Sequence, residues 1–184
     1  MPNRATIVHG WQGSPDINWF QWVGKELQKL GYTVDIPQMP NADNPKFSDW
    51  METLEALTPN ENTLLIGHSL ANSLILRYLE KRTAKAKAAF LVAAWDWLME
   101  DIKEYHQTFF ETPFDYEAIK AKNIPITIVN STNDPYIDFE QSKGLAAKLN
   151  ATFIGIENAG HFNEKAGYTT FPQLFEILKE RHHR

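Results

Sequence analysis

The sequence predicts an α/β protein with a mostly parallel sheet of about six strands and helices on both faces. Short apolar runs alternate with amphipathic stretches about six times along the 184 residues. The run at residues 88–94 is apolar throughout, as is typical of a parallel strand that is covered on both faces. The chain has the length of one domain and contains no linker, repeat or low-complexity segment. We therefore expect residues 1–184 to form a single domain.

The first three elements follow from local pattern. Residues 4–9 form a short apolar run before a glycine and are predicted to be a buried strand. Residues 18–30 place tryptophan, valine and leucine side chains at helical spacing, and Gly31 follows as a C-terminal stop. Residues 32–36 are predicted to be a second strand, which Pro37 ends.

The middle of the chain continues this alternation. Three prolines indicate a loop at residues 37–45, and a helix is expected at residues 48–57. Residues 63–66 are predicted to be the third strand, and residues 69–81 a long helix. The apolar run described above, residues 88–94, is the fourth strand.

The last part of the chain begins with a segment of weaker pattern. Within residues 95–123 we expect short helices at residues 96–105 and 114–122. Beyond it the alternation resumes, and the remaining strands and helices are expected at residues 125–130, 139–149, 152–156 and 170–181.

Composition excludes several classes of function. Acidic residues outnumber basic ones by 23 to 18, and no long basic run is present, so a nucleic-acid partner is not expected. The longest apolar run, residues 88–95, is too short to span a bilayer. The absence of cysteine excludes disulfides, thiolate metal sites and cysteine nucleophiles. We expect a cytoplasmic protein that needs no metal or organic cofactor and acts on a small-molecule substrate; no particular oligomeric state is predicted.

The segment with the clearest chemical meaning is Gly67-His68-Ser69-Leu70-Ala71. It lies between a predicted strand and a predicted helix and matches the nucleophile-elbow pattern G-x-S-x-G, with alanine in place of the last glycine. Small flanking residues are needed there because the serine occupies a strained turn and the helix packs closely against the sheet. The motif therefore predicts an α/β-hydrolase fold with Ser69 as nucleophile; the alternative is a serine that only caps the helix.

A base and an acid are expected after the nucleophile in chain order. His161 follows the last predicted strand within Gly160-His161-Phe162 and is the predicted general base. Asp134 follows the fifth predicted strand and is the predicted acid that orients the imidazole. Asp96, after the fourth strand, is the rival for that role.

The oxyanion hole needs two backbone N–H groups. Leu70, the residue after the nucleophile, is expected to supply one, and Trp11, in the glycine-containing loop after the first strand, the other. An ordinary glycine-rich turn is the alternative interpretation of that loop.

Trp95 and Trp97 lie near the end of the fourth predicted strand, on the expected active face. One hypothesis is that they form the wall of an apolar substrate pocket, and the alternative is that they seal the sheet edge. The pocket is expected to form from the loops at residues 12–18, 37–45 and 95–113, with residues 97–113 as a candidate partial lid.

Taken together, these motifs resemble the small serine hydrolases related to YdeN and to the retinoblastoma-binding serine hydrolase. The resemblance is carried by His9-Gly10-Trp11, the elbow, and the segments at residues 92–95, 131–136 and 160–163. It implies a compact fold without a large lid domain, a triad of Ser69, Asp134 and His161, and esterase-like or peptidase-like activity. The retinoblastoma-contacting signature L-x-C-x-E is missing because the chain has no cysteine, so that interaction is not expected.

The expected function is a serine hydrolase that cleaves a small ester, amide or thioester through an acyl-enzyme on Ser69. The alternative is a non-catalytic protein-binding module that retains the hydrolase fold.

Overall fold

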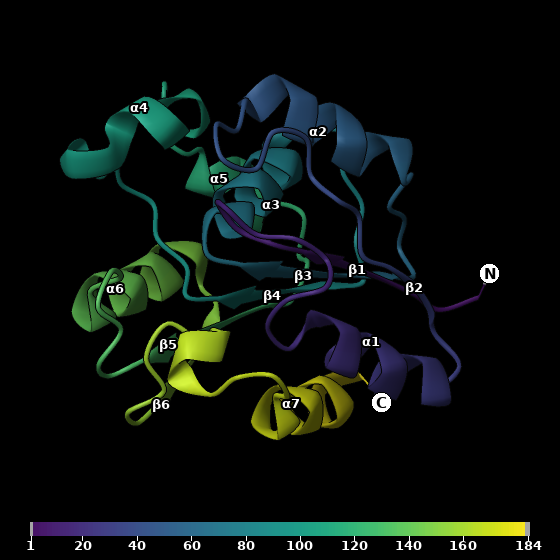
Figure 1. Cartoon of the computed structure of the whole chain (residues 1–184). Helices are drawn as coiled ribbons and strands as arrows, with labels where there is room; N and C mark the ends of the chain where they lie inside the picture. Colours follow the sequence, from purple (N-terminus) through teal and green to yellow (C-terminus); the bar gives the residue numbers. More distant parts are fainter. Residues whose placement is uncertain (1, 183–184) are drawn as a thin grey trace.

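The computed structural model describes residues 2–182 and contains one sheet of six parallel strands in the order β2-β1-β3-β4-β5-β6 (Figure 1). The strands are β1 (Arg4–Val8), β2 (Thr33–Asp35), β3 (Thr63–His68), β4 (Ala88–Val92), β5 (Ile126–Ser131) and β6 (Thr152–Ile156). The predicted α/β class, with about six mostly parallel strands, is confirmed.

Helices cover both faces of the sheet (Figure 1). They are α1 (Phe20–Lys29), α2 (Phe47–Ala56), α3 (Leu70–Glu80), α4 (Lys103–His106), α5 (Tyr116–Lys120), α6 (Phe139–Leu149) and α7 (Pro172–His182). One layer runs from α2 through α3 and α5 to α6, each helix in contact with the next. On the other face α1 and α7 lie side by side, and the ring of Trp22 in α1 contacts the ring of Phe175 in α7.

The centre of the sheet is the most deeply buried part of the molecule. Every residue of β3, β4 and β5 is buried, and so are residues 70–79 of α3. Because all six strands are parallel, their carboxyl ends open at one edge of the sheet, and the loops that follow β1, β3, β5 and β6 meet there. In open α/β sheets this edge is where ligands bind.

The helix predicted over residues 96–105 is wrong at its start and in its continuity. Helical structure begins at Glu100 and consists of a 3-10 turn (Glu100–Ile102), the single turn α4 and a second 3-10 turn (Gln107–Phe109). The side chain of His106 binds the backbone at both ends of the first 3-10 turn: Nδ1 donates to Ile102 O at 2.8 Å, and Nε2 accepts from Met99 N at 3.2 Å. A side chain that satisfies backbone groups in this way replaces a regular helix.

Two predicted boundaries also shift, for backbone reasons. The strand predicted over residues 88–94 ends at Val92, because Ala93 has a positive φ of 54°. The helix predicted from residue 69 begins at Leu70, because Ser69 has a φ of 58°. Among residues 2–182, no helix combines the length and apolar character needed to cross a bilayer.

Candidate active site

Ser69 lies in a tight turn between β3 and α3, with φ 58° and ψ −125°. Few non-glycine residues adopt a positive φ, and those that do are held there by their surroundings. Here the Ser69 N–H donates to Val92 O at the end of β4, at 2.9 Å. The turn also needs a small residue at Gly67, where a Cβ atom would lie 2.5 Å from Asn72 Oδ1. The segment therefore has the backbone of a nucleophile elbow.

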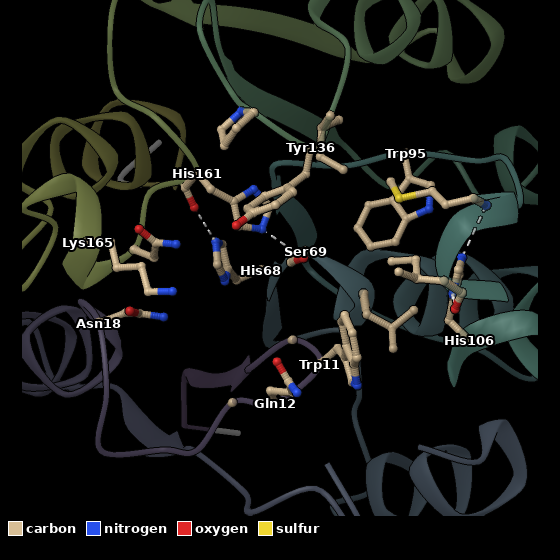
Figure 2. Close-up of a pocket in the computed structure, with 18 of the residues that line it drawn as sticks. Trp11, Gln12, Asn18, His68, Ser69, Trp95, His106, Tyr136, His161 and Lys165 are labelled. Atoms are coloured by element: carbon tan, nitrogen blue, oxygen red, sulfur yellow. Dashed lines mark hydrogen bonds between the residues drawn. The ribbon is translucent and has the colours of Figure 1, made fainter. Parts of the chain in front are cut away.

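The structure brings the three predicted triad side chains together. His161 Nε2 lies 3.0 Å from Ser69 Oγ, and His161 Nδ1 lies 2.8 Å from Asp134 Oδ2 (Figure 2). The Asp134 side chain has no exposed surface. Its other oxygen, Oδ1, accepts hydrogen bonds from the backbone N–H groups of Tyr136 at 2.9 Å and Ile137 at 3.1 Å. These bonds hold the carboxylate in one orientation, so that Nδ1 carries the proton and Nε2 faces the serine.

The loop that carries His161 is attached to the end of β5 by three consecutive side chains. The N–H group of Asn158 donates to Thr132 Oγ1 at 3.1 Å, and that of Ala159 donates to Ser131 Oγ at 2.9 Å. The N–H group of Gly160 donates to Asn133 Oδ1 at 2.8 Å. The segment Ser131-Thr132-Asn133 therefore positions the loop of His161, and the next residue, Asp134, binds the His161 ring itself.

Asp96, the rival acid, lies in a different environment. Its Oδ2 atom accepts from the Tyr116 hydroxyl and forms an ion pair with Lys148. Burial, followed by the hydrogen bond to Asp96, raises the pKa of Tyr116. Asp96 therefore joins the segment after β4 to α5 and α6, and Asp134 is the carboxylate that is bonded to His161.

The loop after β1 lies directly against the elbow. A Cβ atom on Gly10 would be 2.8 Å from Ser69 Cβ, so only glycine permits this approach. His9 binds the loop to the chain behind it, since its Nε2 accepts from Met39 N at 3.0 Å. Within residues 2–182, the N–H groups of Trp11 and Leu70 donate no hydrogen bond. Both predicted oxyanion donors are therefore unpaired.

A cavity of about 800 Å³ opens above Ser69. Trp95 and Trp97 both line it, and Trp95 is only 4% exposed. Trp11 lies on the same side of Ser69 as Trp95 (Figure 2). Its ring stacks on that of Tyr105, with 4.9 Å between the ring centroids. Asn18 and Lys165 lie on the opposite side of Ser69 (Figure 2). The cavity therefore has an aromatic half and a polar half, with Ser69 between them.

Of the three loops expected to form the pocket, two do so. Residues from 12–18 and 95–113 line the cavity, and residues 97–102 and His106 form one of its walls. The expectation for residues 37–45 is wrong, because none of them lines the cavity. That loop lies behind Trp11 and supports it: Ala42 O accepts from Gln12 N at 2.8 Å, and Asp43 O accepts from the Trp11 indole at 2.9 Å.

Two short segments of the lining were not predicted from the sequence. Residues 135–137 follow Asp134, and residues 163–165 follow His161. The ring of Tyr136 lies 5.0 Å from that of His161, at nearly a right angle, and the residue is 60% exposed. The signal that could have revealed both segments is their position, immediately after a predicted catalytic residue.

Burial controls the charge of three histidines near the site. It is the main cause that lowers the pKa of His68 to about 3, and the charge of His161 lowers it further. Burial also lowers the pKa values of His9 and His106. All three are therefore neutral near pH 7. Among residues 2–182, no three His, Asp or Glu side chains are grouped so as to hold a metal ion.

Comparisons with known proteins identify the family of the chain. The family described as "Serine hydrolase" matches residues 5–180. YdeN of Bacillus subtilis (strain 168) is 31% identical over 182 residues, which cover 97% of this chain and 95% of YdeN. Serine hydrolase RBBP9 of Rattus norvegicus is 31% identical over 183 residues, with the same coverage of 97% and 95%. The crystal structure of the B. subtilis ydeN gene product superposes with a TM-score of 0.90 at 28% identity, covering 99% of this chain and 100% of that one. The chain therefore belongs to the serine hydrolase family.

Proposed function

We propose that this hydrolase cleaves a small ester through an acyl-enzyme on Ser69, and that amides and thioesters are further substrates of the same chemistry. The observation that carries the proposal is the continuous hydrogen-bonded chain from Ser69 Oγ to His161 Nε2, at 3.0 Å, and from His161 Nδ1 to Asp134 Oδ2, at 2.8 Å. This is the arrangement that allows an imidazole to remove a serine proton while a buried carboxylate stabilises the resulting imidazolium.

In the first step, His161 Nε2 takes the hydroxyl proton of Ser69 as Oγ attacks the substrate carbonyl carbon. The carbonyl oxygen becomes an oxyanion, and the unpaired N–H groups of Trp11 and Leu70 bind it. His161 then gives its proton to the departing alcohol oxygen as the bond between that oxygen and the carbonyl carbon breaks. In the second step, His161 takes a proton from water as the water oxygen attacks the acyl carbon. The bond between that carbon and Ser69 Oγ then breaks, Oγ takes the proton back from His161, and the carboxylic acid leaves.

The position of the base orients the substrate. His161 must protonate the leaving group, so the leaving group lies on the side of the cavity where His161, Asn18 and Lys165 are found (Figure 2). The acyl group then lies on the opposite side of Ser69, against Trp95 and Trp97. We propose an apolar acyl group for this reason, because aromatic walls favour apolar ligands.

Labelling with a fluorophosphonate probe tests the proposal, because the probe reacts with an activated serine. Wild-type protein should be labelled on Ser69 and the Ser69→Ala variant should not. Ser48→Ala is a matched control, since Ser48 is exposed on α2 and bonds only to Asp49. Equal labelling of wild type and Ser69→Ala would refute the proposal.

The alternative, a protein-binding module that retains the fold, predicts an unreactive Ser69. A panel of p-nitrophenyl esters separates the two functions further. If Ser69→Ala and His161→Ala both reduce hydrolysis by a factor on the order of 10⁴ or more, the result supports the catalytic function. Hydrolysis that both variants retain supports the binding module.

A further inference from the structure

Two buried side chains donate hydrogen bonds to consecutive carbonyl groups of the loop that carries the base. His68 Nε2 lies 2.8 Å from His161 O, and Trp19 Nε1 donates to Phe162 O at 3.0 Å (Figure 2 shows the first bond). His68 is the last residue of β3, and Trp19 immediately precedes α1. The donors are 4% and 0% exposed, so water does not compete for these carbonyl groups.

The backbone of this loop is one that needs support. Asn158, Gly160 and Phe162 all have positive φ values, of 54°, 56° and 50°. Two of them are not glycine, and such residues keep a left-handed backbone only where neighbouring groups hold it. The side chains of residues 131–133 bind the N–H groups at the start of the loop. His68 and Trp19 bind the carbonyl groups at its end, where His161 itself lies.

His68 has the protonation and the orientation that this contact needs. A carbonyl oxygen only accepts hydrogen bonds, so His68 must carry a proton on Nε2. Burial keeps the ring neutral near pH 7, which leaves a single proton, and the contact with His161 O places it on Nε2. The His68 ring packs against the rings of Trp19 and Phe20, with 5.9 Å and 5.8 Å between the ring centroids, and this packing restricts its rotation.

We propose that His68 and Trp19 are positioning residues that fix His161 in reach of Ser69 by clamping the two carbonyl groups of residues 161 and 162. Neither residue takes part in the proton transfers. The catalytic consequence rests on the proposed function, whereas the effect on the loop does not. A base displaced by about 1 Å can cost on the order of 100-fold in rate, so loss of either donor should slow the chemistry.

Three variants separate the donor from the ring. His68→Phe keeps a buried aromatic ring and removes the N–H, whereas His68→Gln places an amide N–H near the position of Nε2. Trp19→Phe removes the second donor. Trp22→Phe is the matched control, because Trp22 lies in the first turn of α1, close to Trp19 along the chain, and contacts Phe175, away from the loop.

Two measurements on these variants test the clamp. Hydrogen exchange followed by mass spectrometry should show faster exchange at residues 157–163 in His68→Phe and Trp19→Phe, with wild-type exchange in Trp22→Phe. The kcat for a p-nitrophenyl ester should fall about 10- to 100-fold in the first two variants, with KM within about two-fold. His68→Gln should recover most of both properties.

The outcomes distinguish the clamp from the proposed function. Wild-type exchange at residues 157–163 in both His68→Phe and Trp19→Phe would overturn the clamp, whatever the activity. Equal loss in His68→Gln and His68→Phe would also overturn it, because the ring rather than the donor would then matter. An inactive wild type would refute the proposed function alone, and the exchange measurement would still decide whether the clamp exists.

Discussion

Lowering the pH from about 7 to about 5 should destabilise the folded protein by about 2 kcal/mol through His68 alone. In the folded state the pKa of His68 is about 3, below its ordinary value of 6.5, mainly because burial disfavours the charged ring. Below about pH 6.5 the unfolded chain therefore binds a proton that the folded chain does not. The contribution of His68 is present in full above that pH and is lost as the pH falls toward about 3.

The size of this loss of stability follows from the distance between the pH and the ordinary pKa of histidine. Between the two pKa values, each unit by which the pH falls lowers the free energy of unfolding by about 1.4 kcal/mol. The ordinary pKa is 6.5, and pH 5 lies about 1.5 units below it. His9 and His106, whose pKa values are also lowered by burial, add losses of the same sign. Those losses occur equally in a His68→Gln variant, so the comparison of the two proteins isolates His68.

Urea unfolding followed by tryptophan fluorescence at a series of pH values measures this effect. The free energy of unfolding should fall more steeply with acid in wild type than in His68→Gln, and the gap should change by about 2 kcal/mol between about pH 7 and about pH 5. Parallel curves for the two proteins would refute the claim that His68 is held neutral in the folded state.

Three further predictions concern the site. Asp134→Asn should lower kcat for a p-nitrophenyl ester by a factor on the order of 10⁴, whereas Asp96→Asn should lower it less than about 10-fold; equal losses would contradict the assignment of the acid. Gly10→Ala should lower kcat on the order of 100-fold, because the added methyl group meets Ser69 Cβ at 2.8 Å and displaces the loop of Trp11; an unchanged kcat would exclude that loop from the oxyanion hole. Trp95→Ala should alter the preference for acyl chain length, measured as kcat/KM from acetate to octanoate esters, and an unchanged preference would remove Trp95 from the acyl side.

The strands and the elbow could be predicted because their signals are local. The apolar run at residues 88–94 and the small residues around Ser69 each express a constraint from immediate neighbours: burial on both faces for the first, and a turn with no room for a side chain at Gly67 for the second. The meeting of Ser69, Asp134 and His161 could also be predicted, because parallel strands bring the loops at their carboxyl ends to one edge of the sheet.

What the sequence did not predict depends on contacts between distant residues. The break in the helix predicted at residues 96–105 arises from His106, whose side chain binds backbone groups that a helical pattern assigns to the backbone. The contact of His68 with His161 O joins residues 93 positions apart, and nothing in the motif Gly67-His68-Ser69 specifies it. The loop at residues 37–45 supports Trp11 from behind, and its composition does not distinguish a support from a pocket wall.

The most direct measurement of the central claim is the capture of the covalent intermediate. Wild-type protein mixed rapidly with an excess of a p-nitrophenyl ester, quenched in acid and digested should yield one acyl group per chain, on the peptide that contains Ser69. His161→Ala should accumulate almost none in the same time. An acyl group on another residue, or ester hydrolysis with no acyl group on Ser69 in the wild-type protein, would contradict the account.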